Sequence, residues 1–334
     1  MDKVLLFGAS SYGLMAYDSI KHEKKIIGFI DNDKQKWGKE LNGVKIYSPD
    51  YIYENNFEVI ITSAYYKEIS EQLNNAQFFN YSIYRMYYEK NTLHDSETII
   101  NTLPVISLGH LIENLGPVEI NSVSFLHGGS LLTDYLLLRG LVQQFNAKTY
   151  LEIGTWTGES LMSVHQIVDK SYSISLPDDD ELLVNIFDRY CNKANFSRYF
   201  SKGKDNIVSF YEDSLKFDYS RIGETIDLVF IDGDHSFNGV YKDTSNIFNY
   251  VGYENTIVVW HDFKTNTNQL ICSTFDAVRK ALPEKYHKNL FSVDTSISGV
   301  YIPEKFQDKI KINEDRNELY SYSLKVDVKK NELK

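Results

Sequence analysis

The chain has 334 residues, of which 43% are hydrophobic and 24% are charged, a composition typical of a globular protein that is large enough for two domains. Its formal charge of −11 argues against a broad nucleic-acid-binding surface, which has to be basic. No apolar run approaches the roughly 18–20 residues that span a bilayer, and the short VLLF run leads into a glycine, so we expect neither a membrane span nor a secretory signal.

Residues 1–100 are predicted to form a small Rossmann-like domain with its connector. Apolar runs that indicate strands are KVLLFG, KIIGFID and FEVIITS, and helical spacing follows in SYGLMAYDSIK and YYKEISEQL. Turn-forming residues gather around Gly38 and Gly43, and Ser48-Pro49 is typical of the start of a helix. Strands that alternate with helices predict a parallel sheet covered on both faces. The Tyr- and Asn-rich stretch 74–103 has weak periodicity and is predicted to end the domain and connect it to the next.

Residues 101–334 are predicted to form a second, larger domain of the same α/β class. A helix is expected over 130–145, where SLLTDYLLLRGLVQQF is strongly apolar. Strands are expected at TYLEIG, SYSISL, NIVSFY, IDLVFID and TIVVWHD, and NLFSVD and SGVYI are expected to close the sheet as an antiparallel hairpin. In such a sheet ligands bind outside the carboxyl ends of the strands. The chemistry of this chain should therefore lie just after each strand.

The first of these strand ends carries a glycine-rich turn. In TYLEIGTWTGES, Glu152 ends a strand, Gly154 opens the turn and Gly158 begins a helix, and glycines allow the backbone to turn tightly beside a ligand. This pattern resembles motif I of class I S-adenosylmethionine-dependent methyltransferases, although Trp156 stands where many members have a glycine. The resemblance implies that S-adenosylmethionine contacts Glu152, Gly154, Thr155 and Gly158.

The same resemblance implies further cofactor contacts after the next strands. Members of the family commonly present an acid to the cofactor ribose after the second strand, where this chain offers Ser175 or Asp178. Asp213 follows the third strand, at the position that implies a contact to the adenine amine, and Asp232 follows the fourth. The alternatives are a solvated acidic loop around Asp178 and a helix N-cap at Asp213.

Acids and histidines follow the fourth and fifth strands. Because neighbouring parallel strands end at the same sheet edge, we expect Asp232, Asp234, His235, His261 and Asp262 to lie close together. Oxygen-rich ligand sets of this kind suit Mg²⁺ or a similar divalent ion, whereas thiolates are missing. The alternative is a capped turn at DGDH beside a buried core histidine.

The spacing of DGDH and the later HD resembles that of metal-dependent sugar and macrolide-sugar O-methyltransferases. The resemblance implies that Asp232 and Asp262 hold the metal and that His235 is the catalytic base, with Asp234 as a further catalytic candidate. His261 stands where a second acid often precedes Asp262, so it is a candidate metal ligand. A base is needed because a sugar hydroxyl is a weak acid and a poor nucleophile at neutral pH.

The segments LFGASSYG, GFIDND, GKELNGVKIYSP and FEVIITS resemble the nucleotide-binding-like domain of bacterial sugar acetyltransferases and sugar C-methyltransferases. This resemblance covers about the first 75 residues and implies that Gly8, Ser10, Gly13 and Asp31 contact a nucleotide-sugar. The alternative is a scaffold domain without a ligand. A nicotinamide dehydrogenase is disfavoured, because the turn GASSYG lacks the three-glycine spacing of dinucleotide sites.

Together these resemblances imply an S-adenosylmethionine-dependent methyltransferase that O-methylates a sugar hydroxyl of a nucleotide-sugar, surface-glycan or natural-product precursor, as in polysaccharide biosynthesis. A sugar C-methyltransferase and a non-catalytic scaffold are the alternatives. The expected partners are a small-molecule or glycan substrate, with homo-oligomerisation left open. Cys191 and Cys272 lack the spacing of metal ligands, which favours reduced thiols in the cytoplasm.

Overall fold

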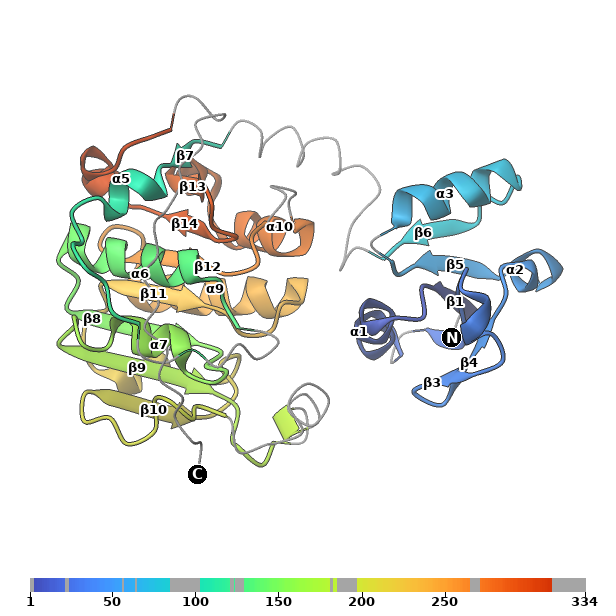
Figure 1. Cartoon of the computed structure of the whole chain (residues 1–334), viewed down its shortest axis with the longest axis horizontal. Coiled ribbons are helices and arrows are strands. Elements are labelled where there is room, and N and C mark those ends of the chain that lie inside the picture. Colours follow the sequence, from blue (N-terminus) through green and yellow to red (C-terminus); the bar gives the residue numbers. More distant parts are fainter. Residues whose placement is uncertain are drawn as a thin grey trace. The chain divides into compact units, whose positions relative to one another are not determined.

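The structure of the chain is a computed structural model, in which two compact units are distinguished, Met1–Thr92 and Leu93–Lys334 (Figure 1). The residues that it describes are 3–21, 24–55, 57–63, 65–84, 103–120, 123, 129–180, 183–184, 197–264 and 271–313. Cys191 lies outside them. Both units are mixed α/β with mostly parallel sheets, which confirms the predicted fold class.

The first unit is built on one sheet with the strand order β3-β4-β2-β1-β5-β6, parallel except for the β3–β4 pair. Its strands are β1 (Lys3–Phe7), β2 (Lys25–Ile30), β3 (Glu40–Leu41), β4 (Val44–Tyr47), β5 (Glu58–Ile61) and β6 (Tyr81–Ile83). Its helices are α1 (Ser11–Ile20), η1 (Lys34–Lys36), α2 (Asp50–Asn55) and α3 (Tyr66–Asn75). The three predicted strands and two predicted helices are all present.

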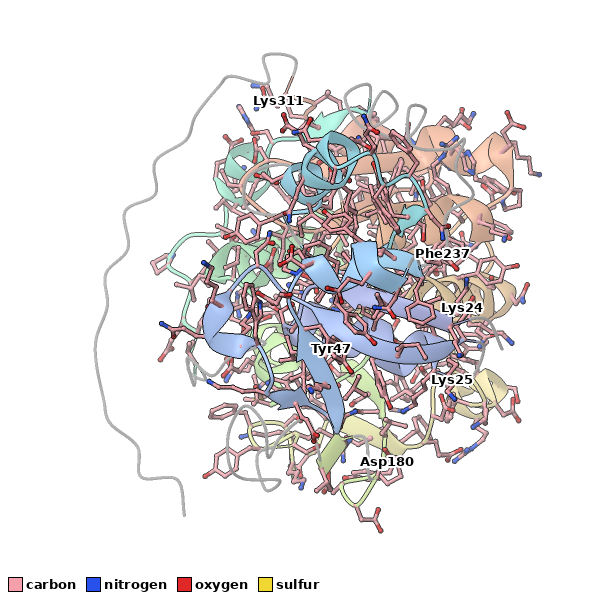
Figure 2. The ribbon with its side chains drawn as sticks, turned by 90° about the vertical axis from the view of Figure 1, so that its right-hand side faces the viewer. Lys24, Lys25, Tyr47, Asp180, Phe237 and Lys311 are labelled. Atoms are coloured by element: carbon pink, nitrogen blue, oxygen red, sulfur yellow. The ribbon has the colours of Figure 1, made fainter. Side chains whose placement is uncertain are left out.

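The sequence patterns predict no strand at β6, which lies inside the stretch 74–103 that is expected to end the first domain and connect it to the next. Its residues are only half-buried, and it gains its backbone hydrogen bonds by pairing with β5 at the sheet edge. Such an edge strand lacks a distinct apolar alternation, so its existence depends on the neighbouring strand. Towards the other edge of the sheet, the ring of Tyr47 at the end of β4, labelled in Figure 2, stacks on that of Tyr51 with centroids 3.9 Å apart.

The second unit contains a larger sheet with the order β10-β9-β8-β11-β12-β14-β13-β7. Its strands are β7 (Val105–Ile106), β8 (Thr149–Ile153), β9 (Lys170–Ser175), β10 (Ile207–Tyr211), β11 (Leu228–Ile231), β12 (Ile257–Trp260), β13 (Leu290–Val293) and β14 (Gly299–Tyr301). Its helices are α5 (Leu108–Ile112), α6 (Leu132–Phe145), α7 (Glu159–Val164), η3 (Tyr219–Ile222), α9 (Phe237–Val251), α10 (Cys272–Ala281), η4 (Glu284–Asn289) and η5 (Glu304–Lys309).

The five predicted parallel strands, β8 to β12, and the antiparallel β13–β14 hairpin are confirmed. So is the apolar helix predicted over 130–145, which is α6. No sequence pattern predicts β7, whose two residues pair with the end of β13. Within the described part of the chain, no helix is both long enough and apolar enough to cross a bilayer.

Helices cover both faces of the second sheet. Side chains alternate between faces along a strand, and Tyr150, Phe230 and Val259 belong to the buried cluster that includes Leu138 of α6 and Leu161 of α7. Figure 1 shows these two helices in front of the sheet. The opposite face packs on α9, where the indole nitrogen of Trp260 donates to Thr244 at 2.9 Å. The strand ends therefore emerge between two helical layers, at the edge where ligands bind in this class of fold.

Candidate functional site

A glycine turn links β8 to α7 at the carboxyl edge of the second sheet. Gly154 has φ +86° and Gly158 has φ +91°, a left-handed conformation that favours glycine. A Cβ on Gly154 would overlap the backbone carbonyl of Asp232, and one on Gly158 would press on the Ser201 side chain. The turn after β8 is therefore packed directly against the loop after β11, with no space for a side chain at either glycine.

The buried carboxylate of Glu152, near the end of β8, holds this turn in place through hydrogen bonds. Its two oxygens accept hydrogen bonds from the Thr155 hydroxyl and the Tyr150 hydroxyl, each at 2.8 Å. Burial raises the pKa of Glu152 to about 7, although these hydrogen bonds act in the opposite direction. The Thr155 hydroxyl also lies 2.7 Å from that of Ser173. Glu152 and Thr155 thus form one buried network that fixes the path of the turn.

A segment about forty residues further along the chain holds the same turn, and no sequence motif predicts it. The backbone nitrogen of Arg198 donates to the carbonyl of Trp156 at 2.6 Å, and that of Phe200 donates to the carbonyl of Thr157 at 3.1 Å. These bonds satisfy backbone groups in a loop that has no regular secondary structure. The conformation of the turn therefore depends on tertiary contacts as well as on its glycines.

At the end of β9, the candidate ribose contacts are already engaged. The Ser175 hydroxyl donates to the Thr155 carbonyl at 3.3 Å. The Asp178 carboxylate forms ion pairs with Lys202, at 2.8 Å, and with the buried guanidinium of Arg198. That guanidinium also donates to the Leu176 carbonyl at 2.8 Å. Asp178 thus belongs to a cluster of ion pairs that holds the loop after β9. The loop is therefore not simply a solvated acidic segment.

Asp213, the candidate adenine contact, shapes the turn after β10. Its carboxylate accepts a hydrogen bond from the backbone nitrogen of Leu215 at 3.0 Å and pairs with Lys216 at 3.0 Å. Asp234 has a similar role at the start of α9, where it accepts from the backbone nitrogen and the hydroxyl of Ser236 at 2.9 and 2.6 Å. Both acids therefore stabilise turns in the structure.

The ends of β11 and β12 bring two acids and two histidines together, as the sequence predicted. Nδ1 of His235 lies 2.6 Å from Oδ2 of Asp262, and its Nε2 lies 3.4 Å from Oδ1 of Asp232. Nδ1 of His261 lies 3.1 Å from the same Asp232 oxygen and 3.6 Å from Oδ1 of Asp262. Asp262 has φ +49°, a strained value for a residue with a side chain.

The electrostatics of this cluster follow from its alternating charges. Burial opposes ionisation of Asp232, but the two neighbouring histidines outweigh it and lower its pKa to about 2. Burial likewise disfavours the charge on His235, but the two acids outweigh it and raise its pKa to about 10. The pKa of His261 is raised well above its usual value mainly because Asp232 opposes the effect of burial. His235 remains at the rim, with 43% of its side chain exposed.

Part of the cluster has the geometry of a cation site. Asp232, His261 and Asp262 each offer one ligand atom, and the three atoms lie within 4.8 Å of one another. The contacts of His261 lack the angles of well-formed hydrogen bonds, so no residue that the structure describes satisfies its buried ring nitrogens. A cavity of about 10 Å³ opens beside these residues, which is room for about one water-sized group. The residues therefore fit a divalent cation.

Two buried acids near the site were missed by the sequence analysis. Asp134 lies in the first turn of α6 and faces Nε2 of His261 at 3.5 Å. Asp243 of α9 is fully buried, and burial raises its pKa to about 7. The only available signal was an acid inside an otherwise apolar helical pattern, and at Asp134 that pattern is also typical of a helix start.

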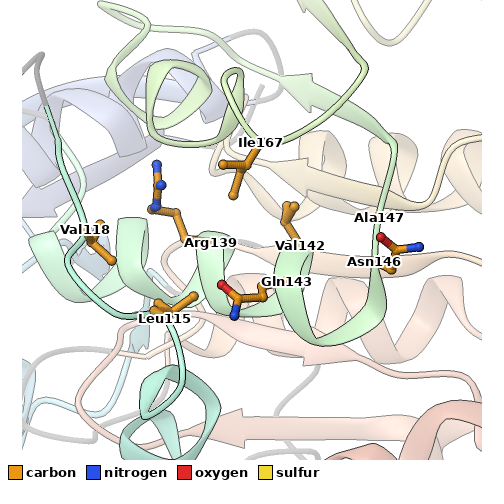
Figure 3. Close-up of a pocket in the computed structure, with 8 residues that line it drawn as sticks. All are labelled: Leu115, Val118, Arg139, Val142, Gln143, Asn146, Ala147 and Ile167. Carbon is orange, nitrogen blue, oxygen red and sulfur yellow. The ribbon is translucent and has the colours of Figure 1, made fainter.

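A larger cavity lies away from this cluster. Its volume is about 230 Å³, and it is lined by Arg139, Val142 and Ile167 among others (Figure 3). A guanidinium nitrogen of Arg139 donates to the Ser163 carbonyl at 2.6 Å, which ties α6 to α7. None of the residues predicted for catalysis or cofactor binding lines this cavity.

In the first unit, the four candidate nucleotide-sugar contacts gather at the carboxyl ends of β1 and β2. Gly8 has φ +132°, and a Cβ there would overlap the Thr62 carbonyl. The Ser10 hydroxyl caps α1 by accepting from the nitrogen of Gly13. Asp31 accepts from the backbone nitrogen of Ala9 and from Lys36, both at 2.9 Å. Asp31 thus links the glycine turn after β1 to the loop after β2.

Comparisons with known proteins agree with this geometry for the second unit. Residues 151–263 match a family model described as a methyltransferase domain, and residues 1–84 match one described as C2185-like, N-terminal. A search of curated proteins finds no match to the chain. The first match confirms the predicted methyltransferase domain.

Solved structures similar to parts of this chain were also found. A UDP-D-quinovosamine 4-dehydrogenase from Vibrio fischeri is 25% identical over 29% of this chain and 85% of that chain, with a TM-score of 0.22. A putative caffeoyl-CoA O-methyltransferase from Staphylococcus aureus is 14% identical over 71% and 97% of the two chains, with a TM-score of 0.36. An amino pentose methyltransferase from Micromonospora echinaspora is 15% identical over 36% and 45%, with a TM-score of 0.26.

Proposed function

Because the second unit carries an S-adenosylmethionine-dependent methyltransferase domain, we propose that this enzyme methylates a sugar hydroxyl of a nucleotide-sugar, surface-glycan or natural-product precursor. One observation carries the proposal: the pair of His235 and Asp262, 2.6 Å apart, lies at the edge of the sheet where the glycine turn after β8 also ends. A proton acceptor thus stands beside the region where the methyl donor binds in folds of this class.

A hydroxyl acceptor has to lose its proton as its oxygen attacks the methyl carbon, and His235 is our candidate base. Its ring is partly exposed, so an acceptor can approach it. The imidazole has to be neutral before it takes a proton, while Asp232 and Asp262 favour its charged form. A divalent cation held by Asp232, His261 and Asp262 would polarise the acceptor oxygen and offset the charge of the two acids.

The cofactor is proposed to lie across the turn after β8. Its contacts would come from the glycine turn at Gly154 and Gly158 and from Asp213 and Asp232 after the neighbouring strands. Glu152, Thr155 and Ser175 support this site from within, because their side chains hold one another and the turn in place. Besides removal of the proton, methyl transfer requires in-line alignment of the acceptor oxygen, methyl carbon and sulfur. The enzyme contributes to this step by holding the acceptor and the cofactor in position.

The first unit is proposed to bind the nucleotide part of such a substrate. Gly8, Ser10, Gly13 and Asp31 meet at one edge of its sheet, where a helix N-terminus offers backbone amides to a phosphate. Isothermal titration of the full chain with uridine diphosphate and thymidine diphosphate tests this. Tight binding of either that is lost in Gly8→Ala supports the proposal, and no binding of either contradicts it.

The proposed reaction is tested with S-adenosylmethionine that carries a labelled methyl group. The full-length enzyme is incubated with a panel of nucleotide-sugars, free sugars and glycans, and the labelled product is located by NMR. An O-methyl ether on the sugar is the expected product. A methyl group bonded to carbon would replace the proposal by sugar C-methylation. If no compound in the panel is methylated, calorimetry with S-adenosylhomocysteine distinguishes two explanations. Binding means that the panel lacks the right substrate, and no binding means that the domain does not bind the cofactor.

A further inference from the structure

Asp134 is a buried acid whose role is not explained by the proposed catalytic residues. It lies in the first turn of α6 and is only 1% exposed. Its Oδ1 accepts a hydrogen bond from the Ser296 hydroxyl at 2.6 Å, and its Oδ2 accepts one from the backbone nitrogen of Leu131 at 2.8 Å. A buried carboxylate with donors on both oxygens is held in one orientation.

The second oxygen of this carboxylate also faces the cation site through His261. Oδ2 of Asp134 lies 3.5 Å from Nε2 of His261. On the other side of the imidazole ring, Nδ1 lies 3.1 Å from Oδ1 of Asp232. The ring is buried, and it therefore bridges one acid that lies deep in the unit and one that lies at the candidate cation site.

We infer that Asp134 is a positioning residue that keeps the proton of His261 on Nε2 and so presents Nδ1 to the cation site. The inference rests on the proposed cation site at Asp232, His261 and Asp262. A neutral imidazole carries one proton, and the nitrogen without it is the metal ligand. Because the Asp134 carboxylate carries negative charge and no proton, its Oδ2, 3.5 Å from Nε2, favours the proton on that nitrogen through electrostatic attraction. Carboxylates behind metal-binding histidines fix ring orientation and tautomer in this way.

The competing explanation is that Asp134 only anchors the loop between β13 and β14. Its Oδ1 lies 3.4 Å from the backbone nitrogen of Ile297 and 3.4 Å from the hydroxyl of Ser298, so it does connect α6 to that loop. An anchoring role predicts lower stability of the fold without an effect on cation affinity. A positioning role predicts the effect on affinity as well, and this difference is measurable.

The test compares Asp134→Asn with Ser296→Ala in the full chain. The asparagine keeps the size of the side chain but removes the negative charge that faces Nε2 of His261. When its oxygen stays at the Oδ1 position for Ser296, its amide nitrogen also places a donor opposite Nε2. Ser296→Ala removes the strongest anchoring bond, at 2.6 Å, and leaves the carboxylate in place. Mn²⁺ binding is followed by the EPR signal of the free ion. We expect Asp134→Asn to weaken Mn²⁺ binding roughly 10–100-fold and Ser296→Ala to leave it within about threefold.

Two further measurements separate the possible failures. If wild type and Asp262→Asn bind Mn²⁺ equally, the proposed cation site is wrong and the inference falls with it. If Asp262→Asn loses Mn²⁺ but Asp134→Asn binds it like wild type, only the role of Asp134 is wrong. Should Asp134→Asn not fold, ¹⁵N NMR of histidine-labelled wild type with Mg²⁺ decides, with His261→Gln to assign the signals. A proton on Nε2 is the expected result, and a proton on Nδ1 overturns the inference.

Discussion

Nδ1 of His235 lies 2.6 Å from Oδ2 of Asp262, so the loops that follow β11 and β12 are joined by their candidate catalytic side chains. The two residues are far apart along the chain, and adjacent parallel strands bring them together. The pair contains the candidate base, His235, and one of the candidate cation ligands, Asp262.

Replacing His235 by Gln is expected to lower kcat by roughly 10²–10⁴-fold, the usual contribution of a general base. KM for S-adenosylmethionine should change little, because glutamine keeps a polar side chain at the rim. Steady-state kinetics on a substrate that becomes labelled in the panel experiment measure both constants. His110→Gln is the matched control, since His110 contacts Ser107 and Lys311 and is not part of the cluster. Full turnover in His235→Gln would remove the base assignment.

Removal of divalent cations is expected to abolish most of the activity. Dialysis against EDTA should lower turnover, and added Mg²⁺ should restore it, because three ligand atoms within 4.8 Å of one another suit a single ion. The matched variant is Asp262→Asn, which should need far more Mg²⁺ for the same turnover. Activity that withstands EDTA in the wild type would show that the acids and histidines form an ion-pair cluster without a metal.

Gly154→Ala is expected to lower the unfolding free energy of the second unit by more than alanine usually costs at a backbone position with positive φ. Gly154 has φ +86°, and a Cβ there would overlap the carbonyl of Asp232. Gly223→Ala is the control, because Gly223 has φ +74° with open space around it. The control should lose about 1 kcal/mol of unfolding free energy and Gly154→Ala about 3 kcal/mol or more, as measured by urea unfolding. Equal losses would mean that the turn can move away from the loop after β11.

Arg198→Gln is expected to lower the free energy of unfolding by about 2–3 kcal/mol, since the guanidinium makes charge-assisted hydrogen bonds in a buried position. Its side chain is 1% exposed, and it holds both Asp178 and the Leu176 carbonyl. Lys202→Gln removes the other cation from Asp178, but that lysine is 44% exposed, so the loss should stay below about 1 kcal/mol. Urea unfolding of both variants measures the two losses of unfolding free energy. A smaller loss in Arg198→Gln than in Lys202→Gln would contradict the prediction.

Asp243 should make the protein less stable as the pH rises. Burial raises the pKa of Asp243 to about 7, although a contact with Ser214 acts in the opposite direction, and no well-formed hydrogen bond from the described residues reaches its carboxylate. The unfolded chain ionises near pH 4, so the stabilising contribution is complete below that pH and is lost as the pH rises through about 7. The total change is on the order of a few kcal/mol.

Asp243→Asn is therefore expected to gain stability relative to wild type between pH 4.5 and pH 8, in urea unfolding at both pH values. Asp218→Asn is the control with the opposite sign: hydrogen bonds from Ser220 lower the pKa of Asp218, so the wild type gains relative to this variant as the pH rises through the acidic range. A difference between wild type and Asp243→Asn that does not vary with pH would show that Asp243 ionises freely.

The succession of the main strands along the chain and the residues at their ends follow from local sequence. Apolar runs such as TYLEIG and IDLVFID are long enough to be fully buried strands, and the acids and glycines that end them mark the ligand-binding edge. For this reason the glycine turn and the cluster of Asp232, His235, His261 and Asp262 were predictable. Weak edge strands such as β6 were not, because a half-buried strand has no pattern of its own.

What the sequence determined by itself was thus the α/β architecture and the set of polar groups that end β8, β11 and β12. The tertiary structure alone decided that Asp134 faces His261 and that Arg198 clamps the turn after β8. These contacts join residues more than forty positions apart, and their partners are chosen by the packing of helices and loops around the sheet. Local periodicity carries no information about such packing. The role of a buried acid in an apolar helix can therefore be inferred only once its neighbours in the fold are known.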